Sequence, residues 1–177
     1  MILGSEDIID LMQHSIIRNA DLSLISAASL DFRLSPIIMT LPHQTTIDSK
    51  KIENLPWESM VMDDSGLILK PGQLYLGSTT EALFLPNNLG AEVCGKSTLG
   101  RLGITIHVTA GWVDPGFSGT VTLEIHTIYP IRIYPGMRVG QFTFIKTTGS
   151  RIPYNGRYQN RQQGQPVTPT GGGMFKV

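Results

Sequence analysis

The feature that most constrains this chain is a series of short segments in which apolar and polar residues alternate. In 104–108, isoleucine and valine alternate with Thr105 and His107, and the alternation in 120–128 is longer and cleaner. A period of two places successive side chains on opposite faces of a β-strand. The 19 glycines and 11 prolines separate these segments at intervals of about ten residues, which is typical of a β-sandwich or β-barrel.

The pattern predicts an all-β domain preceded by one short helix. Ser5 can cap this helix, acidic residues follow in its first turn, and Ile8 and Leu11 share one face. Strands are expected at 29–34, 67–70, 73–77, 82–85, 91–94, 104–108 and 120–128. From Gly149 the alternation stops, and glycine, glutamine and proline become frequent. We therefore predict one domain over 1–148 and a flexible tail over 149–177.

Composition excludes several kinds of protein. The one cysteine, Cys94, cannot form an intrachain disulfide or a zinc site made of cysteines. No apolar run approaches the ~18 residues that a membrane-spanning helix needs, and the first residues lack the basic and apolar segments of a signal peptide. We therefore expect a cytoplasmic protein that does not enter a membrane.

Charge is distributed unevenly along the chain, although the formal net charge is zero. All 14 acidic residues lie at or before Glu124. The basic residues beyond that point are Arg132, Arg138, Lys146, Arg151, Arg157, Arg161 and Lys176. This excess indicates a polyanionic partner, either a nucleic acid or a nucleotide triphosphate, unless the charges only keep the protein soluble. Their sparse spacing argues against a nucleic-acid-binding arm.

Two segments contain residues that suit proton transfer or anion binding. Glu124 lies on the strand face opposite Leu123 and Ile125, in an apolar neighbourhood where a carboxylate can transfer protons; the alternative is a solvated strand residue. Residues 95–103 combine three glycines with lysine, serine, threonine and arginine, which suits a cradle for phosphate or an oxyanion. Because the Walker spacing is absent, a polar turn before a strand is the alternative there.

Several motifs occur in order along the chain. They are Ser29-Leu30-Asp31-Phe32-Arg33-Leu34, the segment 95–103, the segment 107–119, Leu123-Glu124, Pro135-Gly136-Met137, Gly140-Gln141, Pro153-Tyr154 and Arg157-Tyr158. Together they resemble the dCTP deaminase family, which is grouped with the trimeric dUTPases. The resemblance covers most of the chain. It implies a distorted dUTPase-like β-barrel of jelly-roll type, in a homotrimer whose active sites lie between subunits.

The resemblance also implies catalytic roles for four residues. Glu124 matches the glutamate that activates water for attack on C4 of cytosine and passes a proton to the departing amine. Ser97 and Arg101 match the residues that position this water and stabilise developing charge. Asp114 matches the aspartate beside the deoxyribose 3′-hydroxyl, which in the dUTPases orients the water that attacks phosphorus. A pure binding module would not need all four, so the set favours an enzyme.

Substrate binding is implied for a wider set. The cradle residues are Lys96, Ser97, Thr98, Leu99, Gly100 and Arg101, and the base and sugar site comprises Ala110, Asp114, Thr122, Leu123 and Glu124. Gln141 is a further expected substrate-binding residue. The tail 149–177 would close over the active site and contribute Tyr154, Arg157 and Gln162 or Gln163 to the triphosphate. Mg²⁺ would be held by phosphate oxygens and waters, without protein ligands. Departures from the family pattern are Lys96, where arginine is common, and Arg157, where lysine is usual.

No zinc is expected in this chemistry. The zinc deaminases carry a His-x-Glu and a paired-cysteine signature, and the chain has neither spacing. Deamination would therefore depend on hydrogen bonds and a carboxylate. His107 and His126 fit an interface or a pocket rim better than a metal site.

The pair Gly111-Trp112 bears on the number of activities. Family members confined to deamination carry His-Arg after Thr-Ala, whereas bifunctional members carry glycine and an aromatic residue. We expect the small Gly111 to leave room beside Asp114 for a second water. The resemblance therefore implies a hydrolase that deaminates dCTP and cleaves dUTP to dUMP for thymidylate synthesis. A deaminase that stops at dUTP, a plain dUTPase, and a non-catalytic nucleotide- or nucleic-acid-binding module are the alternatives, in that order.

Overall fold

The protein is mostly β in the computed structural model, which describes residues 1–52, 54–149, 152–160 and 164–169. The helices are α1 (Ser5–Gln13), the 3₁₀-helix η1 (Leu22–Leu24) and α2 (Ser97–Arg101). The strands are β1 (Ile17–Arg18), β2 (Leu30–Arg33), β3 (Ile37–Thr40), β4 (Glu58–Val61), β5 (Leu67–Leu69), β6 (Tyr75–Phe84), β7 (Leu89–Gly95), β8 (Ile104–Thr105), β9 (Trp112–Val113), β10 (Ser118–Thr127), β11 (Ile131–Ile133) and β12 (Arg138–Lys146). Among these residues, no helix is long and apolar enough to cross a membrane.

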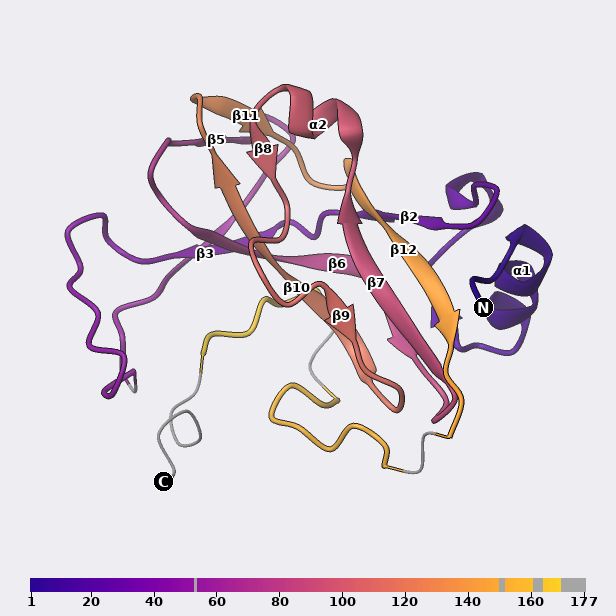
Figure 1. The fold of residues 1–177 in the computed structure, drawn as a ribbon. Coiled ribbons are helices and arrows are strands. Elements are labelled where there is room, and N and C mark those ends of the chain that lie inside the picture. Colours follow the sequence, from indigo (N-terminus) through magenta and orange to yellow (C-terminus); the bar gives the residue numbers. More distant parts are fainter. Residues whose placement is uncertain (53, 150–151, 161–163, 170–177) are drawn as a thin grey trace.

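The strands of the described residues form two larger antiparallel sheets and one small one (Figure 1). One sheet has the order β4-β3-β6-β10-β8, with β1 also paired to β6. The other has the order β2-β12-β7-β9, and β11 pairs with β5. The chain passes repeatedly from one large sheet to the other, because β2, β7 and β12 lie in one and β3, β6 and β10 in the other. The predicted predominance of β-structure is confirmed.

One apolar core contains residues from both larger sheets. The fully buried Phe32 of β2 and Phe142 of β12 pack with 4.6 Å between their ring centroids. Leu83 of β6 and Leu123 of β10 belong to the same core. Gly140 of β12 is glycine because a Cβ there would collide with the Phe32 ring. Side chains of the two sheets thus fill a common interior, as in other stacked sheets.

A bulge in the pairing of β6 with β10 accommodates polar residues in the protein interior. The register shifts between Thr120 and Thr122, so three residues of β6 face Val121. The Thr79 hydroxyl accepts a hydrogen bond from the Val121 N–H at 3.0 Å and donates to the Glu81 carbonyl at 2.7 Å. The polar run therefore has hydrogen-bond partners inside the protein and does not end the strand.

Three sequence expectations are wrong in detail. The strands expected at 73–77 and 82–85 are parts of one strand, β6, since the bulge lets the polar residues between them stay paired. Gly4, not Ser5, caps α1, and its N–H donates to Asp7 at 3.2 Å. Part of the expected turn after β7 is the short helix α2.

An ion pair inside the protein joins β2 to β6. The Glu81 side chain is fully buried, and its carboxylate accepts two 2.7 Å hydrogen bonds from Arg33, one from Nε and one from the backbone N–H. The same guanidinium donates to the Asn19 carbonyl at 2.6 Å. A buried carboxylate is tolerated only when it is paired and hydrogen-bonded, and both conditions hold here.

Replacing Glu81 with glutamine should destabilise the protein, because the Arg33 guanidinium then lacks its ionic partner. We expect Glu81→Gln to lower the free energy of unfolding by about 3 kcal/mol. Urea unfolding at a fixed protein concentration measures this change. The matched control is Glu58→Gln on the exposed edge strand β4, where the change should stay below about 0.5 kcal/mol. Equal stability of the two variants would contradict the assignment.

Candidate functional site

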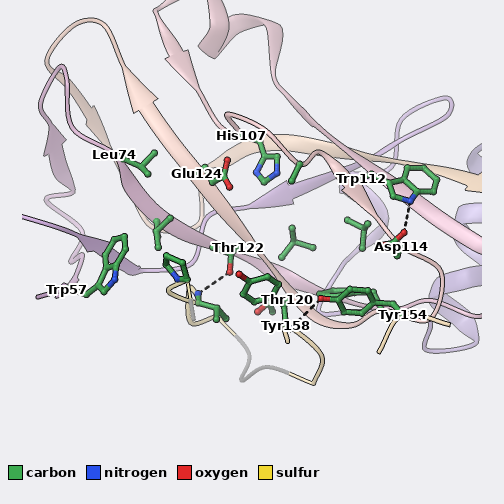
Figure 2. Close-up of a pocket in the computed structure, with 17 residues that line it drawn as sticks. Trp57, Leu74, His107, Trp112, Asp114, Thr120, Thr122, Glu124, Tyr154 and Tyr158 are labelled. Atoms are coloured by element: carbon green, nitrogen blue, oxygen red, sulfur yellow. Dashed lines mark hydrogen bonds between the residues drawn. The ribbon is translucent and has the colours of Figure 1, made fainter. Parts of the chain in front are cut away.

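A cavity of about 480 Å³ opens beside β10 (Figure 2). Its wall is formed by Trp57, Leu74, Leu76, His107, Ala110, Trp112, Val113, Asp114, Phe117, Thr120, Val121, Thr122, Glu124, Tyr154, Tyr158, Val167 and Pro169. Most of the wall area is apolar, and the charged or hydroxyl groups at it belong to Asp114, Glu124, Thr120, Thr122, Tyr154 and Tyr158, with the imidazole of His107 beside them. An apolar wall with a small number of placed polar groups is typical of a site for a small organic ligand.

The alternation of β10 positions Glu124. Leu123 and Ile125 are buried in the core, so Glu124 between them points into the cavity and is partly buried. The Thr109 backbone N–H and hydroxyl both donate to Glu124 Oε2, at 3.0 and 3.3 Å. Within the described residues, Oε1 accepts no hydrogen bond. The carboxylate is therefore oriented through one oxygen and can accept a proton on the other.

Asp114 follows β9 and begins a tight turn. Gly116, the third residue of this turn, has a φ of +88°, a left-handed conformation that favours glycine. The Phe117 N–H donates to the Asp114 carbonyl at 3.2 Å, and the Trp112 indole N–H donates to Asp114 Oδ1 at 3.0 Å. The two acidic residues of the cavity wall, Asp114 and Glu124, are thus held by donors from different positions in the chain.

His107 lies beside Glu124 in the cavity (Figure 2). Both of its ring nitrogens are buried, and neither has a hydrogen-bond partner among the described residues. A buried polar atom left unpaired costs about 1–3 kcal/mol, and no hydrogen bond within the described residues offsets this cost for His107. Among the described residues, no group of three or more His, Cys, Asp or Glu side chains could hold a metal ion.

The first described part of the tail is anchored to the turn after β9. The Tyr154 N–H donates to the Pro115 carbonyl at 2.8 Å. The Gln159 side chain donates from Nε2 to the Gly116 carbonyl at 2.7 Å, and its Oε1 accepts from the Ser118 N–H at 2.9 Å. These bonds place the tail next to Asp114.

The second described part of the tail, residues 164–169, runs along the cavity. The Val167 N–H donates to the Thr122 hydroxyl at 3.0 Å, and the Ser35 hydroxyl donates to the Gly164 carbonyl. Val167 and Pro169 belong to the cavity wall. One side of the cavity is therefore formed by the tail of the same chain.

Comparison with known proteins identifies the family. Residues 2–147 match a family model described as dCTP deaminase-like. The chain belongs to the dCTP deaminase-like family. A relative from Methanoculleus marisnigri, named dCTP deaminase, dUMP-forming, is 38% identical over 147 residues, which are 79% of each chain. One of the same name from Pseudarthrobacter chlorophenolicus is 36% identical over 160 residues, which are 86% of this chain and 84% of the relative.

Other members of this family match a smaller share of their own length. A dCTP deaminase, dUMP-forming, from Nocardioides is 52% identical over 106 residues, which are 58% of this chain and 56% of the relative. The crystal structure of 2′-deoxycytidine 5′-triphosphate deaminase from Agrobacterium tumefaciens superposes with a TM-score of 0.68 at 25% identity. That match covers 81% of this chain and 47% of the Agrobacterium chain.

In this dCTP deaminase-like protein, part of the expected site is assembled within one chain. The expected residues that line the cavity are Ala110, Trp112, Asp114, Thr122, Glu124 and Tyr154. They come from the loop before β9, from β9 and its turn, from β10 and from the tail. Segments far apart in the sequence therefore meet at one cavity.

The expected cradle lies elsewhere in the molecule. Residues 97–101 form α2, at the end of the molecule opposite β9 and the described tail (Figure 1), and none of them lines the cavity. Lys96 Nζ donates to both carboxylate oxygens of Asp31 at 2.7 Å, so its charge is already paired. A single chain does not bring Ser97 and Arg101 to Glu124.

Three other expected residues, Leu123, Gln141 and Arg157, do not line the cavity either. Leu123 is fully buried, because the alternation that exposes Glu124 turns its neighbour into the core. Gln141 of β12 accepts a 3.3 Å hydrogen bond from the Ser29 hydroxyl. Arg157 is exposed outside the cavity wall, and Gln162 lies outside the described residues.

The carbonyl of Gly111 accepts a 2.7 Å hydrogen bond from the Val93 N–H of β7, and Gly111 does not line the cavity. A Cβ at this position would lie 3.3 Å from the Val93 carbonyl oxygen, so the close approach to β7 favours a small residue. The expected space for a second water beside Asp114 stays a prediction.

Sequence reasoning missed several residues of the cavity wall. Leu74 and Phe117 look like core residues in an alternating pattern, and Tyr158 entered only as part of a motif. Trp57 lies in a stretch without alternation. His107 was expected at an interface or a pocket rim. No role was expected for Gln159. The hydrogen bonds of Gln159 depend on tertiary contacts, for which its local sequence carries no signal.

Removing the Gln159 side chain should loosen the tail, because it eliminates both side-chain hydrogen bonds to the turn after β9. We expect Gln159→Ala to increase the rate of tryptic cleavage after Arg157 about tenfold without nucleotide, since local opening then needs less free energy. Mass spectrometry of timed digests measures this rate. The control is Asn155→Ala in the same segment, which should cleave like the unchanged protein; identical rates for both variants would disprove the anchor.

Proposed function

We propose that the protein hydrolyses dCTP to dUMP, by deamination to dUTP and then cleavage of pyrophosphate from dUTP. The observation that carries this proposal is the pair of carboxylates, Glu124 and Asp114, at one largely apolar cavity. Its volume of about 480 Å³ is within the usual range for small-molecule sites. The relatives named dCTP deaminase, dUMP-forming, support the same pair of reactions.

In the deamination step, Glu124 acts as the proton shuttle. Its carboxylate takes a proton from water and delivers it to N3 of cytosine while the water oxygen attacks C4. It then moves the proton of the new hydroxyl to the amino group. The C4–N bond breaks, ammonia leaves with the electron pair, and C4 becomes the carbonyl of uracil. The two bonds from Thr109 keep the carboxylate in place during both transfers.

In the cleavage step, Asp114 orients a second water. The water oxygen attacks the α-phosphorus of dUTP, and the bond from this phosphorus to the bridging oxygen breaks. Pyrophosphate leaves with the electron pair, and the water proton passes through the Asp114 carboxylate to solvent. The product is dUMP.

A homotrimer would complete the site. Helix α2 carries Ser97 and Arg101 but is separated from the cavity of its own chain (Figure 1). Next to α2, three apolar side chains are exposed: Leu102 by 50%, Ile128 by 59% and Tyr129 by 62%. Grouped exposed apolar side chains indicate a contact surface. We propose that another copy of the chain covers them and receives α2 at its own cavity, within a dUTPase-like barrel trimer.

Magnesium fits this site only together with the nucleotide. Two residues of the cavity wall are acidic, and each is hydrogen-bonded to a neighbour. Such a donor set suits Mg²⁺ held through phosphate oxygens and waters, with Arg157 of the tail as a further positive charge. The ion would neutralise charge on the triphosphate.

Analysis of the products formed by the wild-type protein tests the proposed function: dCTP should yield dUMP, pyrophosphate and ammonia. Accumulation of dUTP without dUMP would indicate a deaminase only.

Glu124→Gln should separate the two activities, because the amide keeps the shape of the side chain but cannot accept a proton. We expect ammonia release from dCTP to fall by about 10²–10⁴-fold, while dUTP is still cleaved and dCTP still binds. Ammonia assay, anion-exchange chromatography and calorimetry measure the three quantities. Ammonia release at the wild-type rate would exclude Glu124 as the shuttle.

Mixed trimers should regain activity from two inactive parents. Arg101→Ala removes the expected contribution of α2, and Glu124→Gln inactivates the cavity. If each site combines the cavity of one subunit with α2 of another, equal mixing by co-refolding makes about a quarter of the sites intact. Ammonia release near a quarter of the wild-type rate is therefore expected. Sites built within single chains would give no recovery, and self-mixing of either parent is the control.

A further inference from the structure

Trp112 stands next to Asp114 in a way that the deamination step does not use. We infer that Trp112 is a positioning residue for pyrophosphate cleavage, which it supports by fixing the Asp114 carboxylate. The inference rests on the proposed function, because it takes Asp114 as the group that orients the attacking water. It concerns one step only and leaves the chemistry at Glu124 untouched.

The contact is specific to an indole. Trp112 Nε1 lies 3.0 Å from Asp114 Oδ1, and both side chains belong to the cavity wall (Figure 2). In the described part of the chain, this is the only hydrogen bond that the Asp114 carboxylate accepts. An indole N–H is a donor and never an acceptor, so the contact can persist only with the carboxylate as acceptor. Phenylalanine, with a ring of similar shape, has no donor there.

The position of the indole is itself fixed by β7. Trp112 pairs with Glu92, and its ring packs over Gly90, where a Cβ would collide with ring atoms Cζ2 and Cη2. Gly90 is not among the residues with positive φ, so its conformation does not require glycine. Glycine is required at position 90 because a larger residue would leave no space for the Trp112 ring. Because Trp112 is 43% exposed and absent from the apolar core, the requirement is not explained by core packing.

The two oxygens of the Asp114 carboxylate have different roles in this inference. A charge-assisted hydrogen bond on Oδ1 restricts rotation of the carboxylate and leaves Oδ2 with a defined direction. Oδ2 can then orient the water for in-line attack on the α-phosphorus. Orientation of reacting groups is worth large factors in rate, and a displacement of about 1 Å costs on the order of 100-fold. Glu124 is oriented separately by Thr109, so the deamination step does not share this dependence.

Trp112→Phe tests the inference within one protein. We expect kcat for dUTP cleavage to fall about 10- to 100-fold with KM changed less than about threefold, because positioning affects the reacting state more than binding. Ammonia release from dCTP by the same sample should fall much less than dUTP cleavage, and circular dichroism and sedimentation check that the variant folds and assembles like the wild type. A parallel loss of both activities, or cleavage at the wild-type rate, would overturn the inference.

Two further variants keep the test decisive. Gly90→Ala should displace the ring and cause the same selective loss, although it removes no functional group. Asp114→Ala supplies the reference: if it still cleaves dUTP, the proposed role of Asp114 fails, whereas its loss of cleavage beside an unaffected Trp112→Phe removes only the inference about Trp112. In the Asp114→Ala background, Trp112→Phe should cause no further loss.

A spectroscopic measurement avoids dependence on the stability of the tryptophan variant. The chain has two tryptophans, so ¹⁵N-labelled protein gives two indole resonances. Asp114→Ala should shift the Trp112 resonance and speed its exchange with solvent, and leave the Trp57 resonance in place. An unchanged Trp112 resonance would show that the hydrogen bond is absent in solution.

Discussion

The antiparallel pairing of β10 with β6 is the interaction on which the site depends. It holds Leu123 and Ile125 in the core, and the geometry of a strand then directs Glu124 to the opposite face. The same strand receives the tail, through Ser118 at its first residue and Thr122 near its centre. One strand therefore connects the apolar core, the Glu124 carboxylate and the tail segments that line the cavity.

The two carboxylates of the cavity are held by different hydrogen-bond donors. Thr109 belongs to the loop before β9 and holds Glu124, whereas Trp112 belongs to β9 and holds Asp114. Each carboxylate accepts hydrogen bonds from these donors on one oxygen only. The proposed pair of reactions would then use one cavity in which the two acids are oriented independently.

The sequence predicts those parts of the structure that depend on local periodicity. The alternation in 120–128 places Glu124 correctly, because the direction of a strand side chain follows from its neighbours. It fails for β6, where the polar residues 78–81 find partners in Arg33 and Val121, which are distant in sequence. The strands β3, β4, β11 and β12 are not among those predicted, although Phe142 and Phe144 of β12 alternate with polar residues. The distance between α2 and the cavity is a property of tertiary structure, for which the local sequence carries no signal.

The bulge opposite Val121 has a consequence for how this chain can change during evolution. Because side chains alternate along β10, deleting one residue between the bulge and Glu124 would rotate the carboxylate into the core and expose Leu123 in its place. Substitutions in this stretch are therefore easier to accept than changes in its length. Length variation can instead enter the connection between β3 and β4 or the turns, where no register has to be kept. Sequence change in β10 is thus limited by the number of residues in the strand as well as by their chemical type.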